Sequence, residues 1–269
     1  MKNEELIRAY CARLHLSVPE KLGPDAGTLF RLHRRHVLTV PYENTDYLIG
    51  RIRGTGFETQ FREVILGRRG GMCIDMNPLF GELLTALGYR VGIYPTRICG
   101  RKPEDLNYHV ILIVDDADGR RWWCDVANPF TRFYEPLPLI LGEELWASSS
   151  CFRFQRNAKG SLILSEKSDG TWKDILAVMD TDAGVESRDA SKFSALRDYP
   201  DNAVCFKEIF SLVTPEGRRT LVGNLYRESV PGGFYQLACP PALMPWAYAQ
   251  FGLSKEVLTA EETNGYRKS

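Results

Sequence analysis

One cysteine, Cys73, lies in a setting that favours a reactive thiol. It follows Gly70 and Gly71 and precedes the most regular helical pattern in the chain. Backbone N–H groups at the N-terminus of a helix favour a thiolate, and the adjacent Arg68 and Arg69 add positive charge. The position alone leaves two interpretations open: a nucleophile, or a buried thiol that behaves as a small apolar side chain.

A histidine and an aspartate lie in a predicted hairpin that extends over residues 108–126. If Val114 pairs with Arg120 across antiparallel strands, His109 faces Asp125 on the same side of the sheet. A thiol nucleophile needs a base, and the base needs a group that orients it. The sequence therefore predicts a Cys–His–Asp triad, with a surface cross-strand pair as the alternative interpretation of the last two residues.

The remaining histidines are weaker candidates. His33 and His36 are three residues apart on a predicted helix, which would suit a metal pair, but no third ligand follows as in His-Glu-x-x-His. We expect both to pack or to form hydrogen bonds, and we expect His15 to be structural. No phosphate-binding loop, dinucleotide-binding glycine motif or Gly-x-Ser-x-Gly elbow occurs, so the corresponding chemistries lack support.

The composition is that of a soluble globular protein. Of 269 residues, 44% are hydrophobic and 25% are charged, and 34 basic residues balance 34 acidic ones. We expect no nucleic-acid partner and no membrane span, because a basic footprint and a long apolar run are both absent. The N-terminal MKNEELIRAY does not resemble a signal peptide, and seven cysteines without a Cys-x-x-Cys pair favour free thiols. We therefore expect a cytoplasmic protein without a metal.

The hydrophobic periodicity divides the chain into a helical block (residues 1–90), a β block (91–185) and an α+β block (186–269). Pro78 allows two arrangements near Cys73: a helix with a distorted first turn, or one that starts with Asn77 as its cap. The expected helices are 3–14, 25–38 (with Asp25 as cap), 76–87, 186–198 and most of 232–260. The expected strands are 91–98, 108–114, 121–126, 151–155, 161–165, 171–180 and a hairpin over 206–226, whereas 42–70 is expected to be irregular.

Several segments resemble the arylamine N-acetyltransferase family. The family's Arg-Gly-Gly-x-Cys segment, with Asn four residues beyond the cysteine, is matched by RGGMCIDMN at residues 69–77. Its Pro-Phe-Glu-Asn segment is matched by PYEN at 41–44. The family's histidine and aspartate are matched by NYHV at 107–110 and CDV at 124–126. The resemblance extends from about residue 5 to 255 and includes the hairpin at 206–226.

The resemblance implies an α+β fold of a helical bundle, a β-barrel and an α/β lid around a cysteine-protease-like triad. In that triad Cys73 is the acyl-accepting nucleophile, His109 its base and Asp125 the orienting group, with a Cys–His ion pair at rest. The implied reaction is ping-pong transfer of an acetyl group from acetyl-coenzyme A to an arylamine or hydrazine, the substrates of xenobiotic metabolism. The family's supporting polar cluster maps onto Arg13, Glu43 and Arg69.

The chain departs from the family in the loop after Asp125. Where the family has a Gly-Phe-Gly-like stretch, this chain has Asn128 and Pro129, so we expect a stiffer loop without an aromatic face for the acceptor. The aromatic residues that would replace that face follow slightly further along the chain: Phe130, Phe133 and Tyr134. The substrate and coenzyme A cleft is expected to be lined by Tyr42, Val126, Ala127, Asn128, Pro129 and Phe130.

Three other functions remain open. An amide synthase that closes a macrolactam in polyketide biosynthesis would use the same triad with a carrier-bound thioester. A papain-like or transglutaminase-like hydrolase would turn over a thioester without an amine, and a non-enzymatic binding protein would have an inert Cys73. The sequence does not define the preferred acyl donor, the natural amine or the oligomeric state.

Overall fold

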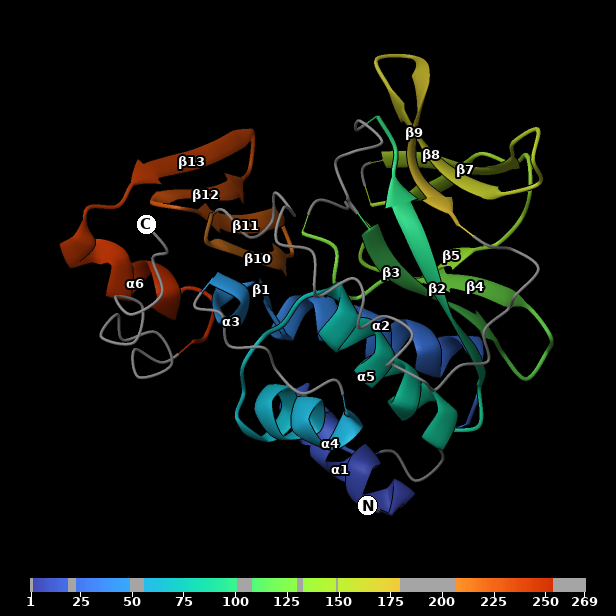
Figure 1. Ribbon diagram of the computed structural model, residues 1–269, viewed down its shortest axis with the longest axis horizontal. Helices are drawn as coiled ribbons and strands as arrows, with labels where there is room; N and C mark the ends of the chain where they lie inside the picture. The colour runs from blue at the N-terminus through green and yellow to red at the C-terminus, as the bar shows by residue number, and fades with distance from the viewer. Residues whose placement is uncertain are drawn as a thin grey trace.

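The chain forms a helical block and two antiparallel sheets in the computed structural model (Figure 1). The structure describes residues 2–18, 23–48, 56–100, 108–129, 133–148, 150–179 and 207–253. In this view the helices of the N-terminal block lie below both sheets, with the eight-stranded sheet at the upper right and the five-stranded sheet at the upper left, and the C-terminal helix lies beside the five-stranded sheet. The expected α+β class is confirmed, whereas the helix expected at 186–198 lies outside the described residues.

The helical block begins with two helices at the expected places. Helix α2 starts after Asp25, whose Oδ1 accepts the Thr28 backbone N–H at 2.9 Å and caps the helix. Residues 42–70, expected to be irregular, instead contain one short strand and several helical turns. The helical bounds are α1 Asn3–Arg13, α2 Ala26–Thr39, α3 Thr45–Leu48, α4 Phe57–Gln60, a π-helix at Phe61–Leu66, and α5 Cys73–Ala86.

Helix α5 begins at Cys73 and continues through Pro78. Of the two arrangements that Pro78 allowed, the structure therefore has the one in which the helix starts at Cys73 and not the one with Asn77 as its cap. Proline has no backbone N–H, so the carbonyl of Ile74 loses its helical partner. The side chain of Gln60 reaches this carbonyl, with Nε2 at 3.4 Å from the oxygen. The helix can therefore begin at Cys73 although Pro78 is inside it, because the Ile74 carbonyl has a hydrogen-bond partner in Gln60.

The larger sheet is antiparallel, and its end strands contact each other, so that it nearly closes into a barrel. The strand order is β5-β4-β3-β2-β9-β8-β7-β6. The strands expected in this part of the chain are all present. The bounds are β2 Arg90–Ile98, β3 Tyr108–Asp115, β4 Arg121–Cys124, β5 Leu137–Pro138, β6 Leu145–Ala147, β7 Ser150–Arg156, β8 Leu162–Ser168 and β9 Thr171–Val178.

The β3–β4 hairpin has a different register from the expected one. Val114 pairs with Trp122, two residues beyond the predicted partner. Asp116 explains the shift, because its Oδ1 accepts two backbone N–H groups of the turn at 2.9 Å and makes the turn start later. The predicted direct pairing of His109 with Asp125 is therefore wrong. A shift of two residues nevertheless keeps both side chains on one face, since side chains alternate with period two.

The smaller sheet joins the C-terminal part of the chain to the helical block. Its strands are β1 Tyr42–Glu43, β10 Ile209–Thr214, β11 Gly217–Val222, β12 Leu225–Val230 and β13 Gly233–Ala238, in that order across the sheet. The side chain of Asn44 extends the β1–β10 pairing: its Nδ2 donates to Lys207 O and its Oδ1 accepts from Ile209 N–H, both at 2.8 Å. The Pro-Tyr-Glu-Asn segment therefore attaches this sheet to the helices.

The prediction of helix over most of 232–260 is wrong for residues 233–238. Phe234 and Tyr235 have high strand propensity, and this segment pairs with β12 as the edge of the sheet. Helix α6, Met244–Ala249, follows a 3₁₀ turn at Pro241–Leu243. In the described ranges, no helix combines the length and apolar character needed to cross a bilayer.

Candidate active site

The three residues of the predicted triad come from separate elements and meet beside the N-terminus of α5. Cys73 is the first residue of that helix, His109 lies in β3, and Asp125 directly follows β4. His109 Nε2 lies 2.7 Å from Asp125 Oδ2, and the ring also interacts with Cys73 by charge and hydrogen bonding. The side chains are buried, with residue exposures of 8%, 4% and 1%, respectively. Such burial strengthens the electrostatic coupling among them.

The electrostatic environment favours a protonated imidazole. Burial alone lowers the pKa of His109, but the charges of Asp125 and Cys73 outweigh it and raise the pKa well above the ordinary value. Burial also disfavours the charged form of Asp125 and by itself would raise the pKa of this carboxyl. The attraction of His109 and hydrogen bonds from Asn77 and Ala127 nevertheless hold that pKa below its ordinary value. The geometry therefore supports an imidazolium beside a carboxylate on one side and a sulfur on the other.

Asn77 fixes the carboxylate from the helix side. Its Nδ2 donates to Asp125 Oδ1 at 3.0 Å and to Val110 O at 2.6 Å, and its Oδ1 accepts from Val126 N–H at 2.9 Å. This buried amide thus connects α5 with β3 and with the chain after β4. The family resemblance includes this asparagine, but no sequence pattern indicated which groups its side chain contacts.

The glycines before the nucleophile allow two chain segments to cross closely. A Cβ atom at Gly70 would lie 2.1 Å from the carbonyl oxygen of Pro41, which no larger residue can tolerate. At this crossing Glu43 N–H donates to Gly71 O at 3.1 Å. Gly70 is therefore required for the approach of β1, and that approach sets the position of the loop that leads into Cys73.

A buried ionic cluster stabilises the same loop. Arg69 donates from Nη2 to Glu43 Oε1 at 3.0 Å and from Nη1 to Asp46 Oδ1 at 2.8 Å. The Arg13 guanidinium instead donates to backbone carbonyls, including Val64 O at 3.1 Å and Arg69 O at 3.4 Å. The three residues of the predicted supporting cluster thus lie around one loop, with Asp46 as a member that the sequence did not reveal.

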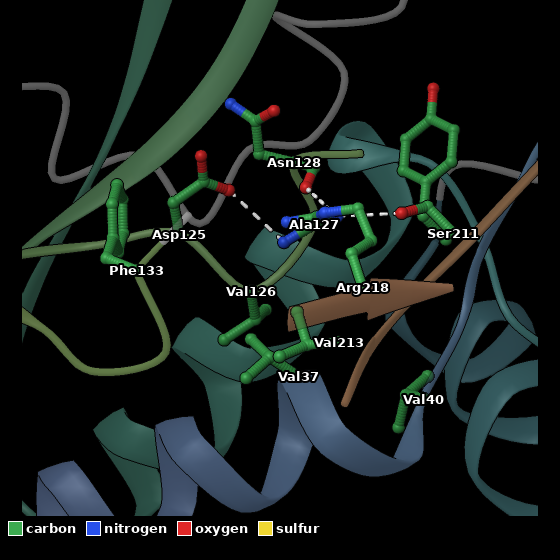
Figure 2. A pocket seen from close by; sticks show the side chains of 11 residues that line it. Val37, Val40, Asp125, Val126, Ala127, Asn128, Phe133, Ser211, Val213 and Arg218 are labelled. Atoms are coloured by element: carbon green, nitrogen blue, oxygen red, sulfur yellow. Dashed lines mark hydrogen bonds between the residues drawn. The ribbon is translucent and has the colours of Figure 1, made fainter. Parts of the chain in front are cut away.

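A cavity next to Asp125 is partly open to solvent, and its space, including the solvent at its mouth, amounts to about 300 Å³ (Figure 2). One side is apolar, formed by valines from the helices and from the smaller sheet, and the other side is polar. Of the predicted cleft residues, Tyr42, Val126, Ala127 and Asn128 line this cavity, Pro129 does not, and Phe130 lies outside the described residues. The cavity is also lined by Val37, Val40, Asp125, Phe133, Ser211, Val213 and Arg218.

Arg218 lines this cavity, although no feature of the sequence predicted that it would. Its Nη1 donates to Pro129 O at 2.9 Å, to Asn128 O at 3.3 Å and to Ser211 Oγ at 2.7 Å. In Figure 2 its side chain extends from the smaller sheet toward the chain after Asp125. No sequence signal linked a residue of the C-terminal hairpin to this loop, because the contact joins positions about ninety residues apart.

Two buried histidines of helix α2 give a prediction about acid stability. Burial lowers the pKa of His33 to about 4 and lowers that of His36 well below its ordinary value, with the neighbouring charges of His33 and Arg13 contributing to the latter. Both are therefore neutral in the folded protein near pH 6, whereas unfolded histidines take up protons near pH 6.5. The unfolded state then binds more protons, so the free energy of unfolding falls as the pH decreases below about 6.5.

We expect a loss of up to about 1.4 kcal/mol per pH unit for each histidine, measured by urea unfolding at pH 7, 6 and 5. Between pH 7 and 6 His109 opposes this slope, because its raised pKa keeps it protonated in the folded state while the unfolded imidazole is still taking up its proton. Well below pH 6 it is protonated in both states and no longer affects the slope. His36→Gln removes one of the two contributions and should roughly halve the slope. An unfolding free energy that stays constant from pH 7 to 5 would contradict the neutral assignment.

Comparison with known proteins identifies the class of protein to which this chain belongs. A sequence model described as N-acetyltransferase matches residues 25–236. The arylamine N-acetyltransferase of Escherichia coli is 28% identical over 137 residues, which cover 50% of this chain and 48% of that protein. Arylamine N-acetyltransferase 2 of Macaca mulatta is 26% identical over 219 residues, covering 74% of this chain and 75% of that protein. The chain thus spans between about half and three quarters of these relatives.

The solved structure of Mycobacterium marinum arylamine N-acetyltransferase in complex with CoA superimposes with a TM-score of 0.77. It is 22% identical and covers 91% of this chain and 92% of the other, so it supports the fold. The chain belongs to the arylamine N-acetyltransferase family, an acyltransferase family.

Proposed function

We propose that this protein transfers an acetyl group from acetyl-coenzyme A to an arylamine or hydrazine, with Cys73 as the acyl carrier. The observation that carries the proposal is the His109–Asp125 contact of 2.7 Å beside Cys73 at a helix N-terminus. Family membership and the coenzyme A complex of the M. marinum relative support the donor class. In this proposal Cys73 is the nucleophile, His109 the acid–base group and Asp125 its orienting partner.

The first half-reaction uses the ion pair. The Cys73 thiolate attacks the thioester carbonyl, and a new carbon–sulfur bond forms while the bond to the coenzyme A sulfur breaks. The leaving coenzyme A sulfur takes a proton from the His109 imidazolium, so that coenzyme A departs as a thiol and the imidazole becomes neutral. The Asp125 carboxylate and the Asn77 amide hold the ring and carboxylate in place, and the low exposure of the site limits hydrolysis.

The second half-reaction restores the starting state. The amine nitrogen attacks the acyl-Cys73 carbonyl and gives its proton to neutral His109. The carbon–sulfur bond to Cys73 breaks, the sulfur leaves as a thiolate, and the imidazolium is regenerated beside it. The enzyme returns to the ion pair with an amide as the product, and His109 acts once as proton donor and once as proton acceptor.

The test is release of coenzyme A from acetyl-coenzyme A with and without an amine. We expect release that continues only when an arylamine or hydrazine is added, with ping-pong initial-rate kinetics. Continued release without an amine would favour a thiol hydrolase. Inactivity with free acetyl-coenzyme A, together with activity on a carrier-bound thioester, would favour the macrolactam-forming amide synthase.

The chain after Asp125 is rigidly held, and this bears on which amine the site accepts. Pro129 restricts its own φ angle and the backbone of Asn128, and Arg218 and Ser211 both donate to Pro129 O. The loop is therefore held by backbone stiffness and by hydrogen bonds from the smaller sheet. Asn128 lines the cavity with a polar side chain, so an aromatic acceptor lacks a stacking partner at this position.

We predict poor turnover of simple arylamines relative to hydrazines, and an improvement in the Asn128→Phe/Pro129→Gly variant. An added aromatic contact is worth about 0.5–1.5 kcal/mol, so we expect a gain of roughly 2- to 13-fold in kcat/KM for the arylamine. The gain should be smaller for a hydrazine without a ring. The measurement is kcat/KM for matched acceptors, with acyl-enzyme formation followed separately by mass.

Arg218→Ala provides a second variant, because it removes the hydrogen bonds that hold Asn128 and Pro129. Arg227→Ala is its matched control: Arg227 lies on the same sheet but stacks over Phe234, 4.0 Å from the ring centroid. Acceptor preference should change in the first variant and not in the second. Efficient wild-type turnover of simple arylamines that does not change in the double variant would show that this loop does not determine the acceptor.

A further inference from the structure

His33 lies beneath the chain that carries Asp125, and both nitrogens of its ring are occupied by backbone groups. The Asp125 backbone N–H donates to His33 Nε2 at 3.1 Å, and His33 Nδ1 lies 3.0 Å from Tyr134 O. The residue is completely buried in helix α2, where its ring packs edge-on against Phe80 with centroids 6.0 Å apart. One side chain thus joins both ends of the segment between Asp125 and Tyr134.

The chemistry of these two partners defines the state of the ring. A backbone N–H can only donate, so Nε2 must be an unprotonated acceptor. A backbone carbonyl can only accept, so Nδ1 must carry the proton. His33 is therefore a neutral imidazole in the Nδ1–H form. Protonation or a change of tautomer would place two N–H groups against each other at Asp125.

Asp125 is consequently held at two places. Its carboxylate is held by Asn77 Nδ2 at 3.0 Å and by the Ala127 N–H at 3.2 Å, both at Oδ1. Its backbone is held by His33. Because the remaining oxygen, Oδ2, must meet His109 Nε2 at 2.7 Å, a small displacement of the backbone would misalign this contact.

We propose that His33 is a positioning residue that fixes the backbone of Asp125, and through it the orientation of His109. The consequence for acyl transfer rests on the proposed function, whereas the consequence for Cys73 reactivity does not. His33 touches neither the substrate nor the reacting atoms, and it acts only through Asp125. Its neighbour His36 provides the contrast, because it is equally buried on the same helix and its Nδ1 lies 3.1 Å from Tyr10 OH.

Two substitutions separate the two contacts of His33. The shorter amide introduced by His33→Asn can replace Nδ1 as the donor to Tyr134 O but cannot reach the Asp125 N–H. The longer amide introduced by His33→Gln can place an oxygen at the position of Nε2 and keep the acceptor for Asp125. His36→Asn is the matched control for loss of a buried imidazole, and circular dichroism and thermal unfolding report whether each variant is folded.

The readouts are the rate of acyl-enzyme formation with acetyl-coenzyme A and the pH dependence of iodoacetamide alkylation at Cys73. We expect His33→Asn to slow acyl-enzyme formation by about 10²-fold, the scale of a 1 Å misplacement. We also expect the midpoint of the alkylation profile to move upward by about one pH unit, because a displaced Asp125 stabilises the imidazolium less. His33→Gln and His36→Asn should stay close to wild type in both readouts.

Equal behaviour of His33→Asn and His36→Asn would overturn the proposal, since the effect would then be one of packing alone. A His33→Gln variant that is as impaired as His33→Asn would also overturn it. If His33→Asn does not fold, ¹⁵N NMR of the wild-type imidazole decides: a protonated Nδ1 with a bare Nε2 supports the contact, and any other state contradicts it. Because alkylation needs no acyl donor, a shifted profile without acetyl transfer would count against the proposed function and not against the role of His33.

Discussion

Cys73→Ser is expected to lower the rate of amine-dependent coenzyme A release by at least about 10⁴-fold, on the scale of losing a nucleophile. Serine has nearly the size of cysteine, so the packing at the start of α5 should persist. Its hydroxyl is a much weaker nucleophile than a thiolate, and the imidazolium beside it cannot also act as the base that removes its proton. Coenzyme A release and thermal unfolding, measured on the same samples, separate a chemical from a structural loss.

Cys99→Ser is the matched control for removal of a thiol. Cys99 follows β2 and is only partly buried, with its Sγ near Arg97 O. This variant should retain wild-type activity. If Cys73→Ser kept comparable activity, or if Cys99→Ser lost as much, the nucleophile would be a different cysteine and the assignment would be wrong.

Asp125→Asn is expected to reduce activity by about 10²–10⁴-fold, the scale of lost acid–base assistance. The Asn77 amide and the Ala127 N–H both donate to Oδ1, so they retain the carbonyl oxygen of the new side chain. Its NH₂ group must then face His109 Nε2, which can accept only if the ring proton moves to Nδ1. This neutral ring cannot accept a proton on the Cys73 side, and an imidazolium would lack the carboxylate that stabilises it.

The control for Asp125→Asn lies in the same hairpin. Asp116→Asn changes a buried carboxylate that accepts from Trp122 Nε1 at 3.0 Å, but this residue lies at the turn of the hairpin, away from the candidate triad. It should cost stability and leave the activity per folded molecule near wild type. Equal activity of Asp125→Asn and wild type would show that another group orients His109.

The residues of the candidate site could be predicted because they belong to short motifs of defined residue types. The glycine pair, the cysteine at a helix start and the interrupted apolar strands all indicate the partners of the triad. The pairing of His109 with Asp125 was wrong in register, although the two side chains meet. The register depends on the turn, and the turn depends on hydrogen bonds that the carboxylate of Asp116 accepts.

The missed features join positions that are distant in the sequence. Asn44 completes the edge of β10, Arg218 holds the chain at Pro129, and His33 contacts the backbone of Asp125. None of these contacts leaves a local periodicity, because each is made by one side chain to a backbone group of another block. The strand at 233–238 was missed for a similar reason, since its pairing with β12 determines its conformation.

Intact-protein mass spectrometry after mixing with acetyl-coenzyme A tests the central claim most directly. We predict that the wild-type mass increases by one acetyl group, that the group maps to Cys73, and that it disappears when an arylamine or hydrazine is added. Cys73→Ser should gain no such mass on the same time scale. An unmodified wild-type protein in the presence of continuing amine acetylation, or an acetyl group on another residue, would contradict the account.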